Sequence, residues 1–214
     1  MTIAAGNRHD LRRLIEERLK DSRPRADASS AVPAGFSAEM DAAIRQYFPA
    51  APVAAAVLVP LVDREEGLSV LLTQRASHLK NHAGQVSFPG GRIEAADEGP
   101  LAAALRETEE EIGLSRQHVT FAGYLEPHLV LTGFWVTPVV GFVQPGFALE
   151  LDRSEVESTF EVPLLHILDA ANHQSRERTL GTTKVLVYDI PYGEHRIWGA
   201  TAGMLISLYR LLHE

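Results

Sequence analysis

Apolar residues recur at helical spacing in several parts of the chain. The helices that this spacing predicts cover residues 9–22, 37–47, 100–112 and 199–212, with a shorter helical segment near residues 163–170. Ser37 is a suitable N-cap for the second of these helices, and Pro100 suits the first turn of the third. Gly113 marks the expected end of that third helix.

The apolar runs between these helices are rich in β-branched residues and predict strands. Two runs, which begin at Val53 and Leu68, are separated by a polar turn at residues 63–67 and predict a hairpin or two neighbouring strands. Further strand-like runs cover residues 119–131, 134–143 and 183–190. A strand-rich chain with a few helices indicates an α+β or mixed α/β fold, and not a repeated series of βα units.

The chain is expected to divide near residue 50. Residues 23–35 contain two prolines, a glycine and several small residues, which is typical of a linker or irregular segment. Residues 1–50 are therefore predicted to form an N-terminal helical extension and linker, and residues 51–214 the main domain. A length of 214 residues suits one domain with such an extension.

Composition and charge narrow the choice of partners and compartment. Hydrophobic residues make up 45% of the chain, which is enough for a substantial core. The formal net charge of −8 argues against nucleic-acid and membrane-surface binding. The absence of cysteine excludes disulfides, thiolate catalysis and cysteine zinc sites, and it fits a cytoplasmic location. The longest apolar run, residues 50–62, is shorter than the roughly 18 residues that a transmembrane helix needs.

Glutamates gather at the C-terminal end of the helix predicted for residues 100–112. Glu107, Glu110 and Glu111 share one helix face, where like charges cost about 0.2–0.5 kcal/mol per pair and the helix dipole adds to the penalty. One interpretation is a solvated acidic face. The other is a divalent-cation site, because Mg²⁺ prefers carboxylate oxygens and such local conflicts tend to mark functional sites. The Gly90–Gly91 pair before the helix favours this second interpretation, since glycine lets backbone approach a ligand.

The stretch from Gly91 to Leu114 resembles the signature of the Nudix hydrolases. That signature has a Gly, a spacer, a Glu, seven residues and then Arg-Glu-apolar-x-Glu-Glu-x-Gly-apolar, which Glu98 and RETEEEIGL match. The spacer between Gly91 and Glu98 has six residues where five are usual, which changes only a loop. Thr108 stands where a larger apolar residue is usual, but it keeps a methyl group on the predicted buried stripe. That stripe comprises Leu101, Leu105, Thr108 and Ile112.

A second segment, LLTQRASHLKNHAGQVSFPGG at residues 71–91, resembles the motif of the coenzyme A pyrophosphatase branch of this family. Its fixed positions match except at Lys80, where Arg is usual. Lysine keeps the charge but lacks the bidentate fork of arginine. If this residue contacts phosphate, the change predicts weaker affinity or an altered substrate preference. The resemblance covers about residues 50–210, so the first 40 or so residues lie outside it.

The resemblance implies a fold, a reaction and a set of metal ligands. The implied fold is a Nudix-type α/β/α sandwich with a mixed β-sheet between helices, and the implied reaction is attack of metal-activated water on a pyrophosphate bond, with Mg²⁺ or Mn²⁺ as cofactor. By resemblance, Glu107 and Glu111 are metal ligands, and Glu110 is a ligand or the general base. The Gly91 carbonyl is expected to add a further ligand.

Other residues are expected to support these ligands or to contact the substrate. Arg106 is expected to serve catalysis by orienting the carboxylates through a salt bridge, and Glu98 to pair with Arg106 or to bind the metal through water. A loop acid elsewhere in the chain is the alternative general base. Arg75 and Lys80 are expected phosphate contacts, because coenzyme A carries a 3′-phosphate besides its diphosphate. For both cations, an ordinary surface position is the alternative.

Several further residues have both a functional interpretation and a simpler structural or surface one. His78 and His82 are candidates for phosphate contact or proton donation, with exposed loop positions as the alternative. Trp198 and Phe134 are expected in the core, and not as adenine stackers. The acids expected to be ordinary turn or surface residues are Glu94, Asp97 and Asp189.

The leading hypothesis is hydrolysis of coenzyme A or its thioesters to 3′,5′-ADP and 4′-phosphopantetheine or its acyl form. The expected partner is a small nucleoside diphosphate substrate, and a homodimer is left open. One alternative is a Nudix pyrophosphatase for another nucleoside diphosphate derivative, such as NADH or ADP-ribose. The others are a catalytically weak nucleotide-binding module and an acidic helix that binds no metal.

Overall fold

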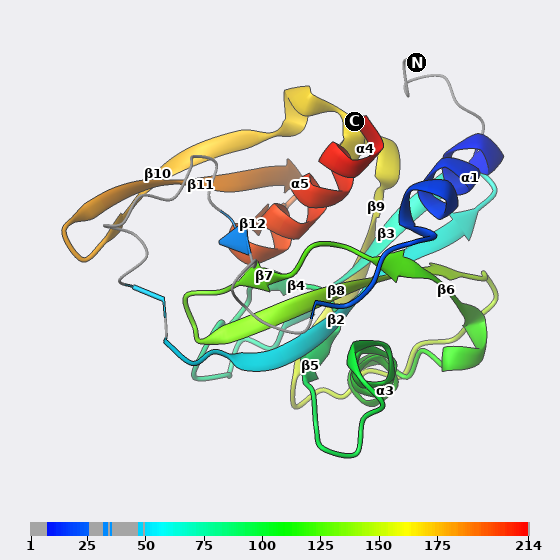
Figure 1. Ribbon diagram of the computed structural model, residues 1–214, viewed down its shortest axis with the longest axis horizontal. Helices are drawn as coiled ribbons and strands as arrows, with labels where there is room; N and C mark the ends of the chain where they lie inside the picture. Colours follow the sequence, from blue (N-terminus) through cyan, green and yellow to red (C-terminus); the bar gives the residue numbers. More distant parts are fainter. Residues whose placement is uncertain (1–7, 26–31, 34, 36–46, 49, 214) are drawn as a thin grey trace.

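A computed structural model describes residues 8–25, 32–33, 35, 47–48 and 50–213 (Figure 1). In chain order the elements are α1 (Arg8–Leu19), β1 (Val32–Pro33), β2 (Val53–Arg64), β3 (Gly67–Arg75), β4 (Val86–Ser87), β5 (Gly90–Arg92), α3 (Pro100–Ile112), η3 (Arg116–His118), β6 (Val119–Tyr124), β7 (His128–Leu129), β8 (Phe134–Val143), β9 (Val156–Pro163), α4 (Leu164–Leu168), η4 (Ala170–Asn172), β10 (Gln174–Leu180), β11 (Thr183–Tyr192), β12 (His195–Trp198) and α5 (Gly199–His213).

The main sheet is mixed, with β2 and β8 paired in parallel at its centre. Its order is β1-β7-β8-β2-β3-β4, with β5 on β2, β6 on β8 and β9 on β3. Both central strands are apolar along almost their whole length, as expected for strands that are covered on two faces. The β2–β3 pair is antiparallel, which confirms the hairpin predicted on either side of residues 63–67.

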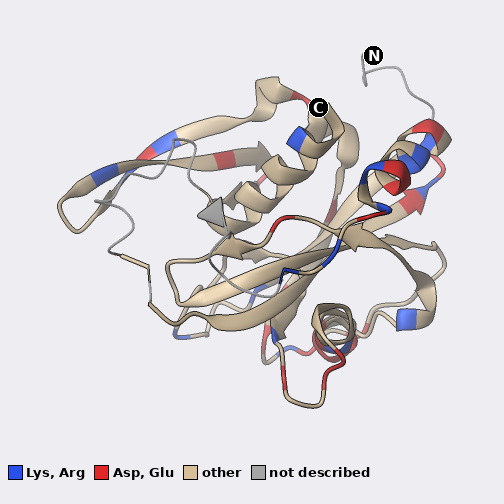
Figure 2. Ribbon diagram, viewed as in Figure 1, with Lys and Arg blue, Asp and Glu red and all other residues tan. Residues whose placement is uncertain are grey.

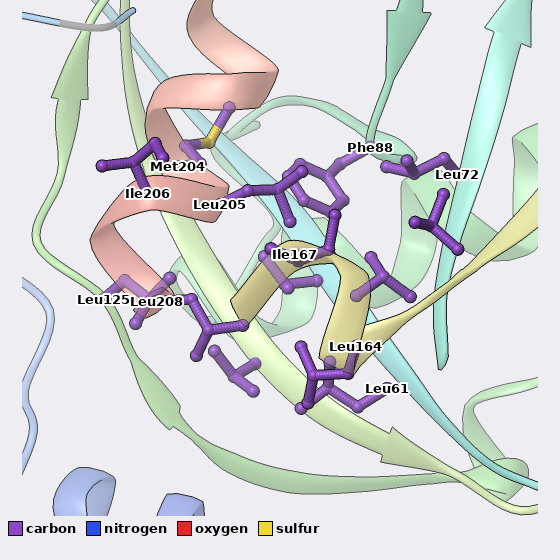
Figure 3. Packing of buried hydrophobic residues seen from close by; sticks show 14 of the residues in the cluster. Leu61, Leu72, Phe88, Leu125, Leu164, Ile167, Met204, Leu205, Ile206 and Leu208 are labelled. Atoms are coloured by element: carbon purple, nitrogen blue, oxygen red, sulfur yellow. The ribbon is translucent and has the colours of Figure 1, made fainter. Parts of the chain in front are cut away.

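Helices cover both faces of this sheet. Residues of β2 alternate between two cores: Ala56, Leu58 and Val62 pack with α3, while Ala55, Val59 and Leu61 pack with α1, α4 and α5. Figure 1 shows α3 on one side of the sheet and the other helices on the opposite side. This arrangement confirms the predicted α/β/α sandwich with a mixed sheet between helices. Figure 3 shows the second core, where side chains of α4 and α5 meet those of the strands.

The N-terminal helix belongs to this second core. The helix predicted for residues 9–22 runs over Arg8–Leu19, and Leu11, Ile15 and Leu19 are buried against the same cluster as α5. The helix predicted for residues 37–47 falls mostly on positions outside the described residues, as does much of the segment predicted as a linker. The division at residue 50 therefore stays a prediction.

A second, three-stranded sheet adjoins the sandwich. Its order is β10-β11-β12, and both pairs are antiparallel. The β10–β11 hairpin extends away from the main sheet in Figure 1, while β12 leads directly into α5 and contacts β4. Among the described residues, no helix has both the length and the apolar character that crossing a membrane requires.

Candidate active site

The acidic end of α3 is closed by a glycine and by the loop before β9. Gly113 adopts φ 69°, and its N–H bonds the Glu109 carbonyl, which confirms the predicted helix end. The backbone amides of Asp152 and Glu150 donate to the carbonyls of Glu111 and Ile112 at 2.9 and 3.0 Å. This loop is thereby held against the acidic helix, and Figure 2 shows acidic residues along α3 and the segment that leads into it.

Glu111 is buried, although it was expected on a shared acidic face. It is 6% exposed, and one of its carboxylate oxygens accepts a hydrogen bond of 3.2 Å from the Gly90 amide. The predicted buried stripe is correspondingly rotated, because Leu101 and Leu105 are only partly buried. The fully buried Thr108 donates its hydroxyl to the Ala104 carbonyl at 2.6 Å, so its polar group is satisfied within the helix.

Glu107 lies directly against the backbone of Gly91. A methyl group added at Gly91 would lie 2.4 Å from the Glu107 carboxyl carbon, closer than real Cβ contacts. Gly91 is also paired with Ala56 of the central strand β2, which holds the glycine backbone in place. The strand β5 therefore places the Gly90–Gly91 backbone next to both Glu107 and Glu111. A metal site built from two carboxylates and a main-chain carbonyl requires this arrangement.

Arg106 ties the acids of this site together. Its guanidinium donates at 3.0 Å to Glu107 and to Glu110, at 3.1 and 3.0 Å to the two oxygens of Asp97, and at 3.1 Å to the Arg92 carbonyl. These five acceptors match the five N–H donors that an arginine has. Arg106 is thus placed to orient Glu107 and Glu110; the sequence predicted this role towards Glu107 and Glu111, but Glu111 accepts the Gly90 amide instead.

Asp97 was expected to be an ordinary turn acid, and that expectation is wrong. Its side chain is 6% exposed, receives the fork of Arg106 and accepts a 2.8 Å bond from the Glu94 amide. The hydrogen bonds from Arg106 hold the pKa of Asp97 below its usual range. We expected Glu98 to pair with Arg106, but Asp97 makes this ion pair. Glu98 is one position further along the loop and is exposed. A water-mediated role of Glu98 stays a prediction.

The carboxylates sit in an environment that penalises their charge. Burial raises the pKa of Glu111 to about 8, and the neighbouring carboxylate of Glu155 adds to this shift. Burial also raises the pKa of Glu107, against the opposing hydrogen bond from Arg106. A bound cation would offset the cost of both charges.

Glu155 is the residue of this site that sequence reasoning did not single out. Its carbonyl accepts a 2.8 Å bond from the Ala76 amide, and its own amide donates to the Asp152 carbonyl at 3.0 Å. These bonds place it beside the end of β3 and near Glu107 and Glu111, whose pKa values it raises. A loop acid was expected only as the alternative general base, and no sequence pattern identified which one.

The two cations predicted to contact phosphate lie in different surroundings. Arg75 ends β3 next to a register shift in the β3–β9 pairing, and its charge acts on Glu111, so it belongs to the site. Lys80 is exposed on the following loop. On the same loop, His78 lies within 3.2 Å of the Ser154 carbonyl, and His82, at φ 59°, lies within 2.7 Å of the Gln85 amide oxygen.

Three residues assigned simpler roles have distinct positions. Phe134 is half-buried and packs against the second core, as expected. Trp198 is also half-buried, with the guanidiniums of Arg178 and Arg196 near its ring. Asp189 is not a surface acid, because it is 1% exposed and forms ion pairs with Arg176 and Arg196.

The donor set at α3 fits a magnesium-like ion. Among the described residues, no three acidic, histidine or cysteine side chains form a ready-made metal cage. Mg²⁺ commonly binds one or two carboxylates and completes its shell with water and substrate phosphate. Glu107 and Glu111 supply two carboxylates beside the Gly91 backbone, and the burial of Glu111 favours a cation as its partner.

Comparison with known proteins identifies the family of the chain. Residues 52–180 match the family model described as NUDIX domain. A relative from Salmonella paratyphi B, "Uncharacterized Nudix hydrolase NudL", is 41% identical over 154 residues, which cover 72% of this chain and 80% of that protein. A relative of the same description from Salmonella enteritidis PT4 has the same identity and coverage.

A solved structure, a MutT/nudix family protein from Enterococcus faecalis, covers 83% of this chain and 66% of its own at 17% identity, with a TM-score of 0.48.

Replacing Glu111 by glutamine should stabilise the metal-free protein at neutral and alkaline pH. The folded carboxyl has a raised pKa, so the folded state binds the proton more tightly and the free energy of unfolding falls as pH rises from about 4.5 towards about 8. Glu111→Gln removes this loss, and at pH 8 it should exceed wild type by roughly 2–4 kcal/mol in chelator-containing buffer. Urea unfolding between pH 4 and 8 measures the difference, which should shrink at the acid end.

The control for that experiment is Glu110→Gln, since the Glu110 side chain is 59% exposed. It should change the free energy of unfolding by less than about 1 kcal/mol at either pH. A lower stability of Glu111→Gln than of wild type at pH 8 would contradict the interpretation of Glu111 as a buried, unpaired charge.

Replacing Gly91 by alanine should displace Glu107 while leaving the fold intact. The added methyl overlaps the Glu107 carboxylate, so hydrolysis should fall on the order of 100-fold, as expected for a misplaced catalytic group. The control is Gly193→Ala, where nothing lies within 4 Å of the new methyl, so the variant carries about 1–2 kcal/mol of backbone strain from its φ of 57° but no contact with Glu107. Circular dichroism and steady-state kinetics measure the two effects; equal activities of the two variants would argue against a role for the Gly91–Glu107 contact.

Proposed function

The chain belongs to the Nudix hydrolase family, and we propose that it hydrolyses the pyrophosphate bond of coenzyme A or of its thioesters. The family assignment makes it a pyrophosphohydrolase of nucleoside diphosphate derivatives. The proposed products are 3′,5′-ADP and 4′-phosphopantetheine or its acyl form. We also propose that the protein acts in the cytoplasm, as the absence of cysteine suggests.

Glu107, Glu111 and the Gly91 carbonyl are the proposed ligands of Mg²⁺ or Mn²⁺. When bound, the ion neutralises diphosphate charge and lowers the pKa of water. The chain itself holds the carboxylates of Glu107 and Glu111 beside the strand β5. Arg106 orients Glu107 and Glu110 through bonds of 3.0 Å, and Asp97 in turn fixes the guanidinium of Arg106.

Two acids are candidates for the general base. Glu110 was the first choice from sequence, but its carboxylate is occupied by the Arg106 guanidinium. Glu155 forms no ion pair among the described residues, and its charge acts on Glu107 and Glu111 from the loop held against α3. We therefore propose Glu155 as the group that takes the proton from the attacking water, with Glu110 as the alternative.

The observation that carries the substrate proposal is the position of Arg75. This residue lies in the segment that resembles the coenzyme A motif, and the fold brings it beside Glu111 at the acidic end of α3. A guanidinium there can bind a phosphate oxygen while the carboxylates face the same diphosphate. Lys80, exposed on the next loop, is proposed to contact the substrate more weakly because it lacks a bidentate fork.

Incubation with coenzyme A and Mn²⁺ should yield 3′,5′-ADP and 4′-phosphopantetheine, which product chromatography separates. Chelation should abolish turnover, and Glu111→Gln should lower kcat on the order of 10³-fold because transition-state charge is no longer offset. The panel should include NADH and ADP-ribose. Rapid turnover of those compounds with none of coenzyme A would contradict the substrate and leave the family assignment intact.

A nucleotide-binding module predicts a different pattern. It would show no turnover of any diphosphate, together with nucleotide binding that Glu111→Gln leaves unchanged. An acidic helix without metal predicts no thermal shift on addition of Mn²⁺. The hydrogen-bonded cluster of Arg106, Glu107 and Glu110, with Glu111 held beside it by the Gly90 amide, supports the enzyme.

If Glu155 accepts the proton, Glu155→Gln should lower kcat by about 10²–10⁴-fold with a small change in KM. The acid limb of the pH profile of kcat should disappear at the same time. Glu157→Gln on β9 is the matched control, because that exposed acid only accepts a 3.2 Å bond from the Ser77 amide. A large loss in Glu110→Gln with near-normal Glu155→Gln would assign the base to Glu110.

A further inference from the structure

A cavity on the opposite side of β3 has no role in the chemistry described so far. It has a volume of about 620 Å³ and lies between the end of β3, the segment that leads into β4, β9 and the strand β12. Amide and hydroxyl side chains line one wall, from Gln74, Gln85 and Ser158. Arg196 and Trp198 of β12 line the other, and the exposed Glu194 lies at the same strand end.

This cavity is joined to the active site through the backbone around Arg75. Gln74 lines the cavity, and the next residue along the strand is the proposed phosphate contact. The Arg75 amide donates to the Gln85 carbonyl at 3.0 Å, and the Gly84 amide donates to the Arg75 carbonyl at 3.1 Å. Gln74 and Arg75 are the last two residues of β3 and their side chains point to opposite faces, so a substrate held at Arg75 would reach the cavity around the end of the strand.

The wall formed by β12 is fixed before any ligand arrives. Asp189 is 1% exposed and accepts bonds of 2.8 and 2.7 Å from the Arg196 guanidinium, while Arg176 pairs with the same oxygen. His195 stacks on Phe160 of β9 with ring centroids 3.6 Å apart. At the start of α5, the Thr201 hydroxyl donates to the Val86 carbonyl at 2.9 Å. The cavity is therefore preorganised.

The chemistry of the lining points to a phosphorylated nucleoside. Trp198 offers an aromatic surface, and the guanidiniums of Arg178 and Arg196 lie 5.4 and 5.9 Å from its ring centre. Arg176, Arg178 and Arg196 stand against two carboxylates, the buried Asp189 and the cavity-lining Glu194, so this group keeps one net positive charge in a chain whose formal net charge is −8. Figure 2 likewise marks basic positions along β10. Gln74 and Gln85 supply both donors and acceptors, as the edge of a base requires.

We propose that this cavity binds the 3′-phosphorylated adenosine half of coenzyme A, with the base against Trp198 and the 3′-phosphate at Arg196. This assignment rests on the proposed function, and it names the part of the substrate that would separate coenzyme A from NADH and ADP-ribose, which lack a 3′-phosphate. Asp189 acts as a positioning residue, since it holds the Arg196 guanidinium without reaching the ligand.

A binding experiment tests the cavity without catalysis. The chain has two tryptophans, and Trp135→Phe leaves Trp198 as the single reporter. The buried Trp135 Nε1 has no hydrogen-bond partner among the described residues, so this replacement leaves no partner unsatisfied. Titration with adenosine 3′,5′-bisphosphate in chelator should change Trp198 fluorescence. Adenosine 5′-monophosphate should bind at least about 10-fold more weakly, as loss of a charge-assisted contact predicts.

Kinetics test the same assignment on the substrate. Wild type should have a kcat/KM at least about 10-fold higher for coenzyme A than for 3′-dephospho-coenzyme A. Arg196→Gln should reduce this ratio to near one through a loss of kcat/KM for coenzyme A. Lys184→Gln is the matched control, because Lys184 pairs with Glu177 on the same sheet and does not line the cavity.

The outcomes separate the two proposals. A ratio near one in wild type, or a ratio that Arg196→Gln leaves unchanged, overturns the cavity assignment while coenzyme A hydrolysis stands. If Arg196→Gln does not fold, Gln85→Ala takes its place, because Gln85 also lines the cavity. A wild-type ratio of the two kcat/KM values in Gln85→Ala then counts against the cavity assignment. If no diphosphate is cleaved, the proposed function fails, and a fluorescence response to adenosine 3′,5′-bisphosphate that Arg196→Gln abolishes still supports the cavity.

Discussion

The site depends on the convergence of four carbonyl and carboxylate groups on the guanidinium of Arg106. All five of its N–H donors are used, on Asp97, Glu107, Glu110 and the Arg92 carbonyl. Without this cation, Glu107 and Glu110 would lose their ion-pair partner at a helix end that is already unfavourable for negative charge. One residue therefore joins the loop after β5 to the acidic helix and orients Glu107, while the Gly90 amide holds Glu111.

Much of the fold followed from periodicity and turn chemistry. The apolar runs at β2 and β8, the hairpin into β3 and the Pro100-to-Gly113 helix were all predictable, because each is a local pattern with a strong physical cause. What periodicity does not contain is pairing between distant segments. The parallel β2–β8 ladder and the placement of β12 against β4 depend on packing across the whole chain.

The same distinction applies to the site. One short stretch of sequence contains Glu107, Glu110 and Glu111, but it does not show that they differ in burial. Glu111 is buried and Glu110 exposed because the helix turns one side towards β5. Asp97 was missed because its partner is nine residues away on another element, and either loop acid offered the same charge. Glu155 was missed because only the docking of its loop onto α3 brings it near the acids.

The central ladder also sets the order in which this enzyme takes shape. Val53 pairs with Phe134, 81 positions later, so a long loop must close before the middle of the sheet exists. Gly91 reaches Glu107 only once β5 has paired with β2. The other edge of β2 pairs with β8, and this pairing forms late because it closes the long loop. A nascent chain in which β8 has not yet been synthesised therefore carries the complete acidic signature without the scaffold that positions it. Competence for catalysis should arise in one late, cooperative step of folding, well after the signature helix itself can form.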